Sequence, residues 1–182
     1  MLESCCLTTS ALHLVFWAMR GGGAGSWGVI VNATFQTYPT FNASRSVVTI
    51  TTADIEMMGN VVTAHSKHIF DWDSLCAGQY FTVSNDPTGQ SMSLTTIFPT
   101  GSVTDAENAL QPFIADIKSL GANITAEPVA SFNINDLAGS DEFVAGNVVF
   151  GSRLIPAIIY CNSPESVGEA YVQLLKERNA NM

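Results

Sequence analysis

Basic side chains are scarce in this chain. Its 182 residues include only 7 Lys and Arg against 16 Asp and Glu, so the formal net charge at pH 7 is −9. A protein that follows a phosphate backbone or an anionic membrane needs a basic patch. The basic residues are scattered instead, at Arg20, Arg45, Lys67, Lys118, Arg153, Lys176 and Arg178. The composition therefore argues against nucleic acid and anionic membranes as partners.

Long apolar runs and metal-binding cysteine pairs are also missing from the sequence. No stretch reaches the roughly 18 uninterrupted apolar residues of a membrane-spanning helix. The apolar residues 11–19 follow the acidic Glu3 and no basic region, which argues against a signal peptide. The four cysteines contain no C-x-x-C, and they are Cys5, Cys6, Cys76 and Cys161. Neither a zinc knuckle nor a thioredoxin-like motif is therefore expected.

Apolar and β-branched periodicity predicts alternating strands and helices. Strands are expected at 28–39, 46–52, 78–85, 91–99, 122–132 and 146–156, with a turn at 40–45. Helices are expected from Thr52 as N-cap to about His68, from a capping box of Thr104 and Glu107 to Gly121, and from Ser163 onward. From 46 to 132 this is the strand-helix-strand-strand-helix-strand order of a ferredoxin-like layer. An α+β domain with an antiparallel sheet covered by helices is the predicted fold class.

The closing helix is predicted to be amphipathic. Its expected apolar face consists of Val167, Ala170, Tyr171, Leu174 and Leu175.

A glycine-rich loop precedes the first predicted strand. Five of the fourteen glycines lie between Arg20 and Gly28, and Gly23, Gly25 and Gly28 fit the spacing G-x-G-x-x-G. A Rossmann site requires a strand before this loop, a helix after it and an acidic residue about 20 positions on. The sequence meets none of the three requirements. Either the loop is a nest of backbone N–H groups for a phosphate or a flat ring system, or it is a tight turn without a ligand.

The neighbours of that loop carry a family resemblance. The segment FWAMRGGGAGSWGVIVNATFQTYP, residues 16–39, resembles the end of the FAD-binding domain in the vanillyl-alcohol oxidase and p-cresol methylhydroxylase superfamily. It looks most like the berberine-bridge-enzyme-like branch, with many fungal FAD-linked oxidases of secondary metabolism. The matching residues are Phe16, Trp17, Ala18, Arg20, Gly21, Gly22, Gly23, Gly25, Trp27, Gly28, Val29 and Pro39, with Met19 in place of leucine.

The resemblance implies a division of the chain and a cofactor. Residues 1–40 would be the C-terminal end of a PCMH-type FAD-binding domain, and residues 41–182 part of a substrate-binding α+β domain. The implied chemistry is hydride transfer from a small organic substrate to FAD. Contacts to FAD are expected from Arg20, Gly22, Gly23, Gly25, Ser26, Gly28 and Val29. Catalytic residues are not identified.

The sequence departs from the family pattern at its start. The His and Cys that hold the flavin in many members are not recognisable, so the chain is expected to be a truncated portion of a longer flavoenzyme. A partner chain or the missing sequence would complete the fold. The alternative is a non-catalytic α+β module that binds a small molecule or a partner. Family members are often secreted, and only then would the sequons at Asn32, Asn42 and Asn123 matter.

Two further groups of residues are candidates for a metal site and for a substrate-binding wall. His65, His68, Asp71 and Asp73 lie within nine residues at the end of a predicted helix. A solvated helix end is far commoner than a metal site, so no metal is expected. Tyr80, Phe81, Phe98 and Tyr160 lie in predicted strands whose exposed face would form the substrate wall by family analogy, with core packing as the alternative.

Overall fold

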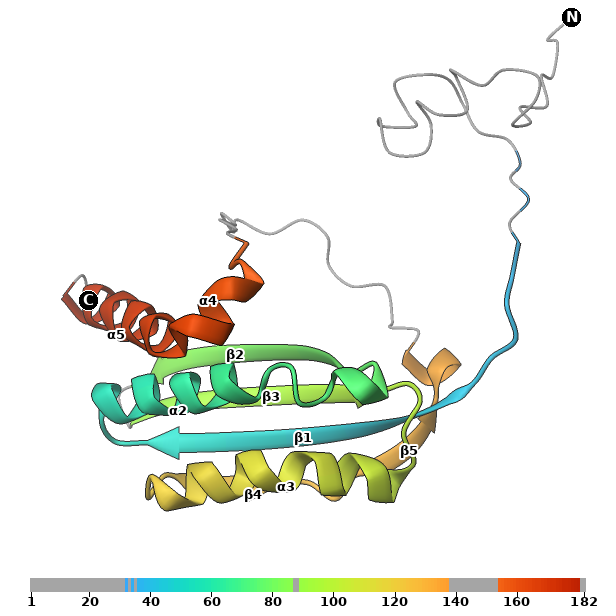
Figure 1. Cartoon of the computed structure of the whole chain (residues 1–182), viewed down its shortest axis with the longest axis horizontal. Helices are drawn as coiled ribbons and strands as arrows, with labels where there is room; N and C mark the ends of the chain where they lie inside the picture. The colour runs from blue at the N-terminus through green and yellow to red at the C-terminus, as the bar shows by residue number, and fades with distance from the viewer. Residues whose placement is uncertain (1–31, 33, 35, 87–88, 138–153, 181–182) are drawn as a thin grey trace, which may run out of the picture. The chain divides into compact units, whose positions relative to one another are not determined.

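An antiparallel sheet with helices on one face forms the described part of the chain (Figure 1). The computed structural model describes residues 32, 34, 36–86, 89–137 and 154–180. Contacts within the chain group residues Met1–Pro39 into one unit and Thr40–Met182 into another. All the described strands and helices lie in the second unit. Among the described residues, no helix is long and apolar enough to cross a bilayer.

Five strands make up the sheet. They are β1 (Asn42–Thr52), β2 (Gly78–Asp86), β3 (Gly89–Phe98), β4 (Asn123–Ala126) and β5 (Ala130–Asn133). The order is β2-β3-β1-β4, β5 also pairs with β1, and every pairing is antiparallel. This order confirms the ferredoxin-like layer and the α+β fold class that the sequence predicts.

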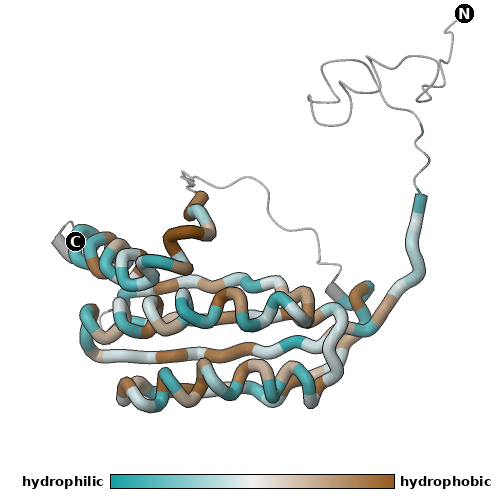
Figure 2. The backbone as a smooth tube through the Cα atoms, viewed as in Figure 1, coloured by the Kyte–Doolittle hydropathy of each residue, from teal (hydrophilic) through white to brown (hydrophobic). Residues whose placement is uncertain are grey.

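Helices α2 (Ile55–His68) and α3 (Val103–Ser119) lie side by side on one face of the sheet (Figure 1). A short 3-10 helix, η2 (Asp73–Leu75), follows α2, and another, η3 (Ile134–Leu137), follows β5. Near the C-terminus, α4 (Ala157–Asn162) leads into α5 (Pro164–Ala180), which packs along α2. Along α2 and α3, hydrophobic stretches alternate with hydrophilic ones, as one face packs on the sheet (Figure 2).

The hydrophobic core lies between the sheet and these helices. The strands contribute Val48, Ile50, Met92, Leu94 and Phe98, and the helices contribute Met58, Val61, Val62, Leu110, Phe113 and Ile117. Trp72, between α2 and η2, is also buried, and its indole Nε1 donates a hydrogen bond to the Ala109 carbonyl oxygen at 2.9 Å. The indole N–H is the only polar group of the Trp72 side chain, which is 1% exposed, so this bond leaves no unpaired polar atom in that side chain.

Two predicted helix caps are wrong. Asp54, and not Thr52, is the N-cap of α2, because its carboxylate accepts a hydrogen bond from the Glu56 N–H at 3.0 Å. Thr52 still belongs to β1 and donates its hydroxyl to the Asp54 carbonyl oxygen. The capping box of α3 is formed by Ser102 and Asp105 rather than by Thr104 and Glu107, since the helix begins at Val103.

Several predicted strand boundaries are wrong as well. The expected turn at 40–45 is mostly strand, because Asn42–Arg45 pair with β5. The expected strand 122–132 is two strands, β4 and β5, and Pro128 between them lacks the N–H needed for a continuous ladder. Residues 32, 34 and 36–39 have no strand pairing, and the rest of 28–39 lies outside the described residues.

The C-terminal region differs from the prediction in two ways. Residues 146–153 of the expected strand lie outside the described residues, and 154–156 are not in a strand. Pro164 does begin α5 as predicted, but Ala170 and Leu174 are exposed whereas Val172 is buried. The reason is that α5 packs on α2, so a stripe through Val167, Val172 and Leu175 faces inward.

Candidate functional site

The face of the sheet opposite α2 and α3 is the candidate functional surface. Side chains alternate between the two faces of a strand, and directly paired residues share a face. In β1 the even-numbered residues from Ser44 to Thr52 are buried beneath the helices. The residues of the opposite face, called the open face below, are Arg45, Val47, Thr49, Thr51, Tyr80, Thr82, Ser84, Ser91, Ser93, Thr95, Ile97, Asn123 and Thr125.

Hydroxyl groups dominate the open face. Ser91, Ser93 and Thr95 alternate along β3 with the buried Met92, Leu94 and Thr96. Thr49 and Thr82 flank Ser93 on the two neighbouring strands, so a row of hydroxyl side chains crosses the sheet. Such a row offers hydrogen-bond donors and acceptors to a bound molecule.

Near one end of the open face, charged, apolar and aromatic residues replace the hydroxyl residues. Arg45, Ile97 and Gly78 are paired across β1, β3 and β2. An added Cβ on Gly78 would meet no heavy atom within 4 Å, so the surface there is open. Tyr80, two residues further along β2, is 76% exposed and is paired with Thr95. The open face therefore combines a cation, an aromatic ring and a space without a side chain.

Of the four residues in the predicted aromatic wall, only Tyr80 lies on the open face. Its neighbour Phe81 points to the opposite side and packs against the core. Phe98 is fully buried, because it shares the helix side with Met92 and Leu94. Tyr160 belongs to helix α4 rather than to a strand, and its ring lies 6.2 Å from that of Phe70.

The histidines near the end of α2 have separate structural roles. His65 is 2% exposed, and its Nε2 lies 2.9 Å from the Gln79 side-chain oxygen. Gln79 in turn donates to the Thr96 hydroxyl at 3.0 Å. Burial lowers the pKa of His65 and outweighs the hydrogen bond to Gln79, so its imidazole is held in the neutral form.

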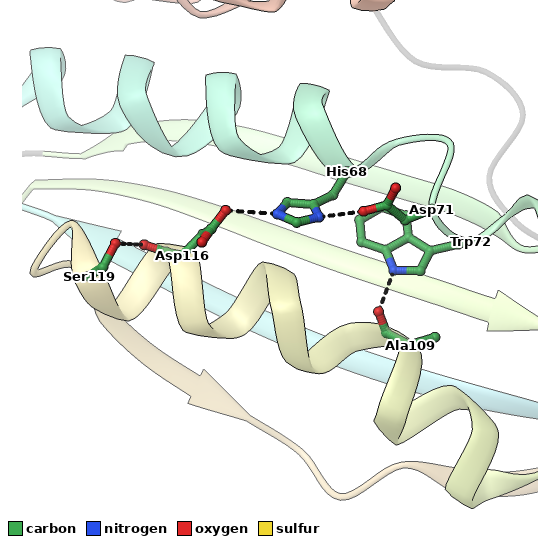
Figure 3. A network of polar contacts seen from close by, with 6 residues as sticks. All are labelled: His68, Asp71, Trp72, Ala109, Asp116 and Ser119. Atoms are coloured by element: carbon green, nitrogen blue, oxygen red, sulfur yellow. Dashed lines mark hydrogen bonds and ion pairs between the residues drawn. The ribbon is translucent and has the colours of Figure 1, made fainter.

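His68 bridges two carboxylates that come from different elements (Figure 3). Its Nδ1 is 2.6 Å from Asp71 Oδ2, and its Nε2 is 2.9 Å from Asp116 Oδ2 on α3. Partial burial opposes protonation, but the hydrogen bonds and charges of Asp116 and Asp71 outweigh it and raise the pKa of His68. The His68 ring therefore ties the end of α2 to α3.

These contacts agree with a structural role for the histidine group. The structure brings His68 and Asp71 together, whereas His65 contacts Gln79 and the aromatic core. In the part of the chain that the structure describes, no group of three or more histidine, cysteine, aspartate or glutamate side chains is arranged to hold a metal ion.

The predicted FAD contacts cannot be placed on this surface. Arg20, Gly22, Gly23, Gly25, Ser26, Gly28 and Val29 all lie outside the described residues. Arg45 lies in the segment 40–45 that the sequence predicts as a turn, so its place on a sheet face was not expected. The alternation of Ser91, Ser93 and Thr95 with apolar residues was the available signal for a strand with one polar face.

Comparison with known proteins agrees with the flavoprotein resemblance. No protein-family model matches the chain. A 37-residue segment is 51% identical to the FAD-linked oxidoreductase penH of Penicillium thymicola and covers 20% of this chain and 6% of that protein. A 36-residue segment is 44% identical to the FAD-linked oxidoreductase asqF of Emericella nidulans, again with 20% and 6% coverage.

The structural comparison extends over most of the chain. The crystal structure of the VAO-type flavoprotein MtVAO615 from Myceliophthora thermophila matches with a TM-score of 0.68 at 18% identity. The match covers 93% of this chain and 31% of the flavoprotein chain. The chain thus spans about a third of that flavoprotein. It has the fold of part of a VAO-type flavoprotein and is similar over a short segment to two FAD-linked oxidoreductases.

Proposed function

We propose that this chain is part of an FAD-dependent oxidoreductase of the berberine-bridge-like branch and that the enzyme acts on a small organic substrate. The resemblance favours a secondary metabolite as that substrate. The observation that carries this proposal is the agreement of two independent likenesses. One is the short, high-identity segment shared with two FAD-linked oxidoreductases, and the other is the fold shared with a VAO-type flavoprotein.

In this proposal one region of the chain binds FAD and the other binds the substrate. Within residues 1–40, the contacts to FAD come from Arg20, Gly22, Gly23, Gly25, Ser26, Gly28 and Val29. Residues 41–182 form the substrate-binding part, with the open face as one wall of the substrate site. A bound flavin supplies the hydride-accepting chemistry. The protein side chains hold and orient the substrate, and the hydroxyl row of β3 offers hydrogen bonds for this purpose.

The rigid support of the open face favours a binding role. Its strands are backed by a core in which Phe98, Phe113 and Trp72 are almost completely buried. Side chains on such a sheet keep their relative positions, which a site that orients a substrate requires. The same observation also supports the second candidate, a non-catalytic module that binds a small molecule on this face.

One measurement separates the two candidates. The native protein is captured from its source with an antibody against α5, and its intact mass and visible absorption spectrum are recorded. An FAD oxidoreductase is expected to show flavin absorption and a mass above the 19.4 kDa of this chain. A mass of 19.4 kDa without flavin would contradict the enzyme and leave the binding module.

A second measurement tests the glycine segment directly. The variant Gly23→Val adds a branched side chain to the loop, which would obstruct the close approach of a flavin. The matched control, Ala170→Val, places the same side chain at an exposed position of α5, away from the open face. Flavin content is expected to fall in the first variant and to stay unchanged in the second. Equal flavin content in both variants would contradict the assignment of the loop.

A further inference from the structure

Arg45 is the only basic residue in the five strands of the sheet. It is exposed on the open face, where its paired neighbours are the neutral residues Ile97 and Ala130. The ion pairs formed among the described residues involve Lys67, His68 and Lys176, and none of them includes Arg45. In a chain with a net charge of −9, Arg45 is therefore a cation without an ion-pair partner among the described residues, on a hydroxyl-rich surface.

An exposed guanidinium of this kind favours one class of ligand. Its planar array of N–H donors matches the two oxygens of a carboxylate and forms paired, charge-assisted hydrogen bonds. Glu127, which follows β4 and donates its backbone N–H to the Val47 carbonyl oxygen, is a carboxylate next to this part of the face, and it forms no ion pair with Arg45. A carboxylate supplied by a ligand therefore complements the charge of this surface.

The neighbouring residues define what else the ligand carries. From Arg45 across β3 to Gly78 are two strand spacings, or about 10 Å between Cα atoms. Ile97 lies between them and offers an apolar surface, while the absence of a side chain at Gly78 leaves space above β2. Tyr80, two residues further along β2, presents an exposed ring on the same face. The dimensions suit a flat ring system attached to the carboxylate.

We propose that the open face binds small aromatic carboxylates, with Arg45 holding the carboxylate and the ring lying on Ile97 beside Tyr80. The inference rests on the proposed function, because it names the substrate class of the same surface. Arg45 is a binding and specificity residue in this arrangement. Tyr80 contributes ring contacts that do not depend on the charge of the ligand.

The test compares two probes that differ in charge alone. Binding of 2-naphthoate and of its neutral analogue 2-naphthamide to the full chain is measured by ligand-observed NMR titration. The chain is expected to bind naphthoate about tenfold or more tightly than naphthamide, as a charge-assisted pair provides. The preference is expected to decrease as salt concentration rises.

Three variants identify the residues responsible. Arg45→Gln is expected to lose the preference for naphthoate and to leave naphthamide binding unchanged. The matched control Lys118→Gln removes an equal charge from exposed α3 and is expected to change neither affinity. Tyr80→Ala is expected to weaken both probes by a similar factor. Circular dichroism of each variant verifies that the fold is retained.

Each contrary outcome has a defined meaning. Failure of the chain to bind naphthoate, no preference between the probes, or a preference that survives Arg45→Gln would overturn the inference. The flavin content of the native protein is measured separately and decides the proposed function. Arg45-dependent naphthoate binding by a protein without flavin would support the carboxylate site and contradict the oxidoreductase. Bound flavin in a protein that shows no preference for naphthoate would support the oxidoreductase and contradict the carboxylate site.

Discussion

The packing of α5 on α2 makes Gly168 a sharp test of the fold. A Cβ atom added to Gly168 would overlap the Thr63 hydroxyl oxygen and the carbonyl oxygen of Gly59. The carbonyl oxygen belongs to the backbone of α2 and cannot rotate away. Gly168→Ala is therefore expected to force the two helices apart and to loosen the packing of Val167, Val172 and Leu175.

The expected size of the effect follows from opposing contributions. Alanine gains about 1 kcal/mol over glycine in helix propensity. Overpacking costs about 1–3 kcal/mol. Partial exposure of the Val167, Val172 and Leu175 side chains costs about 1 kcal/mol more. We expect the free energy of unfolding to fall by about 2 kcal/mol, as measured by urea denaturation followed by tryptophan fluorescence.

Two further variants test the same contact and isolate helix propensity. Gly59→Ala places its Cβ against the Val172 Cγ2 methyl group and near the Gly168 carbonyl oxygen, and because a valine in a helix has one preferred rotamer, a loss of about 1–3 kcal/mol is expected from the other side of the contact. Ala170→Gly lies at an exposed position of α5 and reports helix propensity alone, with a loss of about 1 kcal/mol. If Gly168→Ala were as stable as the wild type while Ala170→Gly lost this amount, the close helix contact would be refuted.

Three further predictions concern other contacts. Ser102→Ala is expected to lower the free energy of unfolding by about 1 kcal/mol, because it removes the N-cap side chain of α3. Thr104→Ala is the control and is expected to have little effect. Equal losses of stability in the two variants, measured by thermal or urea denaturation, would contradict the observed cap. Trp72→Phe keeps an aromatic ring but removes the second ring of the indole and its N–H, which leaves a space in the core and the Ala109 carbonyl oxygen without its donor. A loss of about 1–3 kcal/mol is expected in the same assay, and unchanged stability would contradict the buried, hydrogen-bonded position of the indole. The raised pKa of His68 stabilises the fold fully below its ordinary value of 6.5, and this contribution is lost as pH rises through the folded-state pKa. The free energy of unfolding of wild type and Asp116→Asn is measured by urea denaturation across that pH range, and a smaller pH-dependent loss is expected in the variant. His65 contributes in the opposite direction, because its lowered pKa reduces stability below pH 6.5, but this contribution is common to both proteins and cancels in the comparison. Parallel pH profiles of the two proteins would contradict the bridge between His68 and Asp116.

Local patterns in the sequence predicted much of the secondary structure. The turn signals around Pro87 and Gly89 fixed the β2–β3 hairpin, and Ser163 with Pro164 predicted the start of α5. Gly121, with φ +80°, ends α3 where the sequence placed the helix end. Each of these features depends on residues that are neighbours along the chain, so a single sequence contains the necessary information.

The errors arose where distant segments meet. Asn42–Arg45 became strand because they pair with residues of β5, far along the chain, and these pairings overrode the local turn composition. The buried stripe of α5 was likewise decided by its packing on α2 at Gly59, which no periodicity in α5 alone specifies. Helix start positions shifted by two residues because Asp54 and Ser102 offered well-placed side-chain oxygens.

The sequence by itself determined the α+β composition, the strand-helix order and the short segment that links this chain to FAD-linked oxidoreductases. Only the tertiary structure decided which face of the sheet the helices cover. Because strand residues alternate between faces, that choice buried Phe98, packed Phe81 against the core and left Tyr80 on the same surface as Arg45. Placing the cation and the ring together required three strands to be paired in register, which depends on contacts between residues that are remote in sequence.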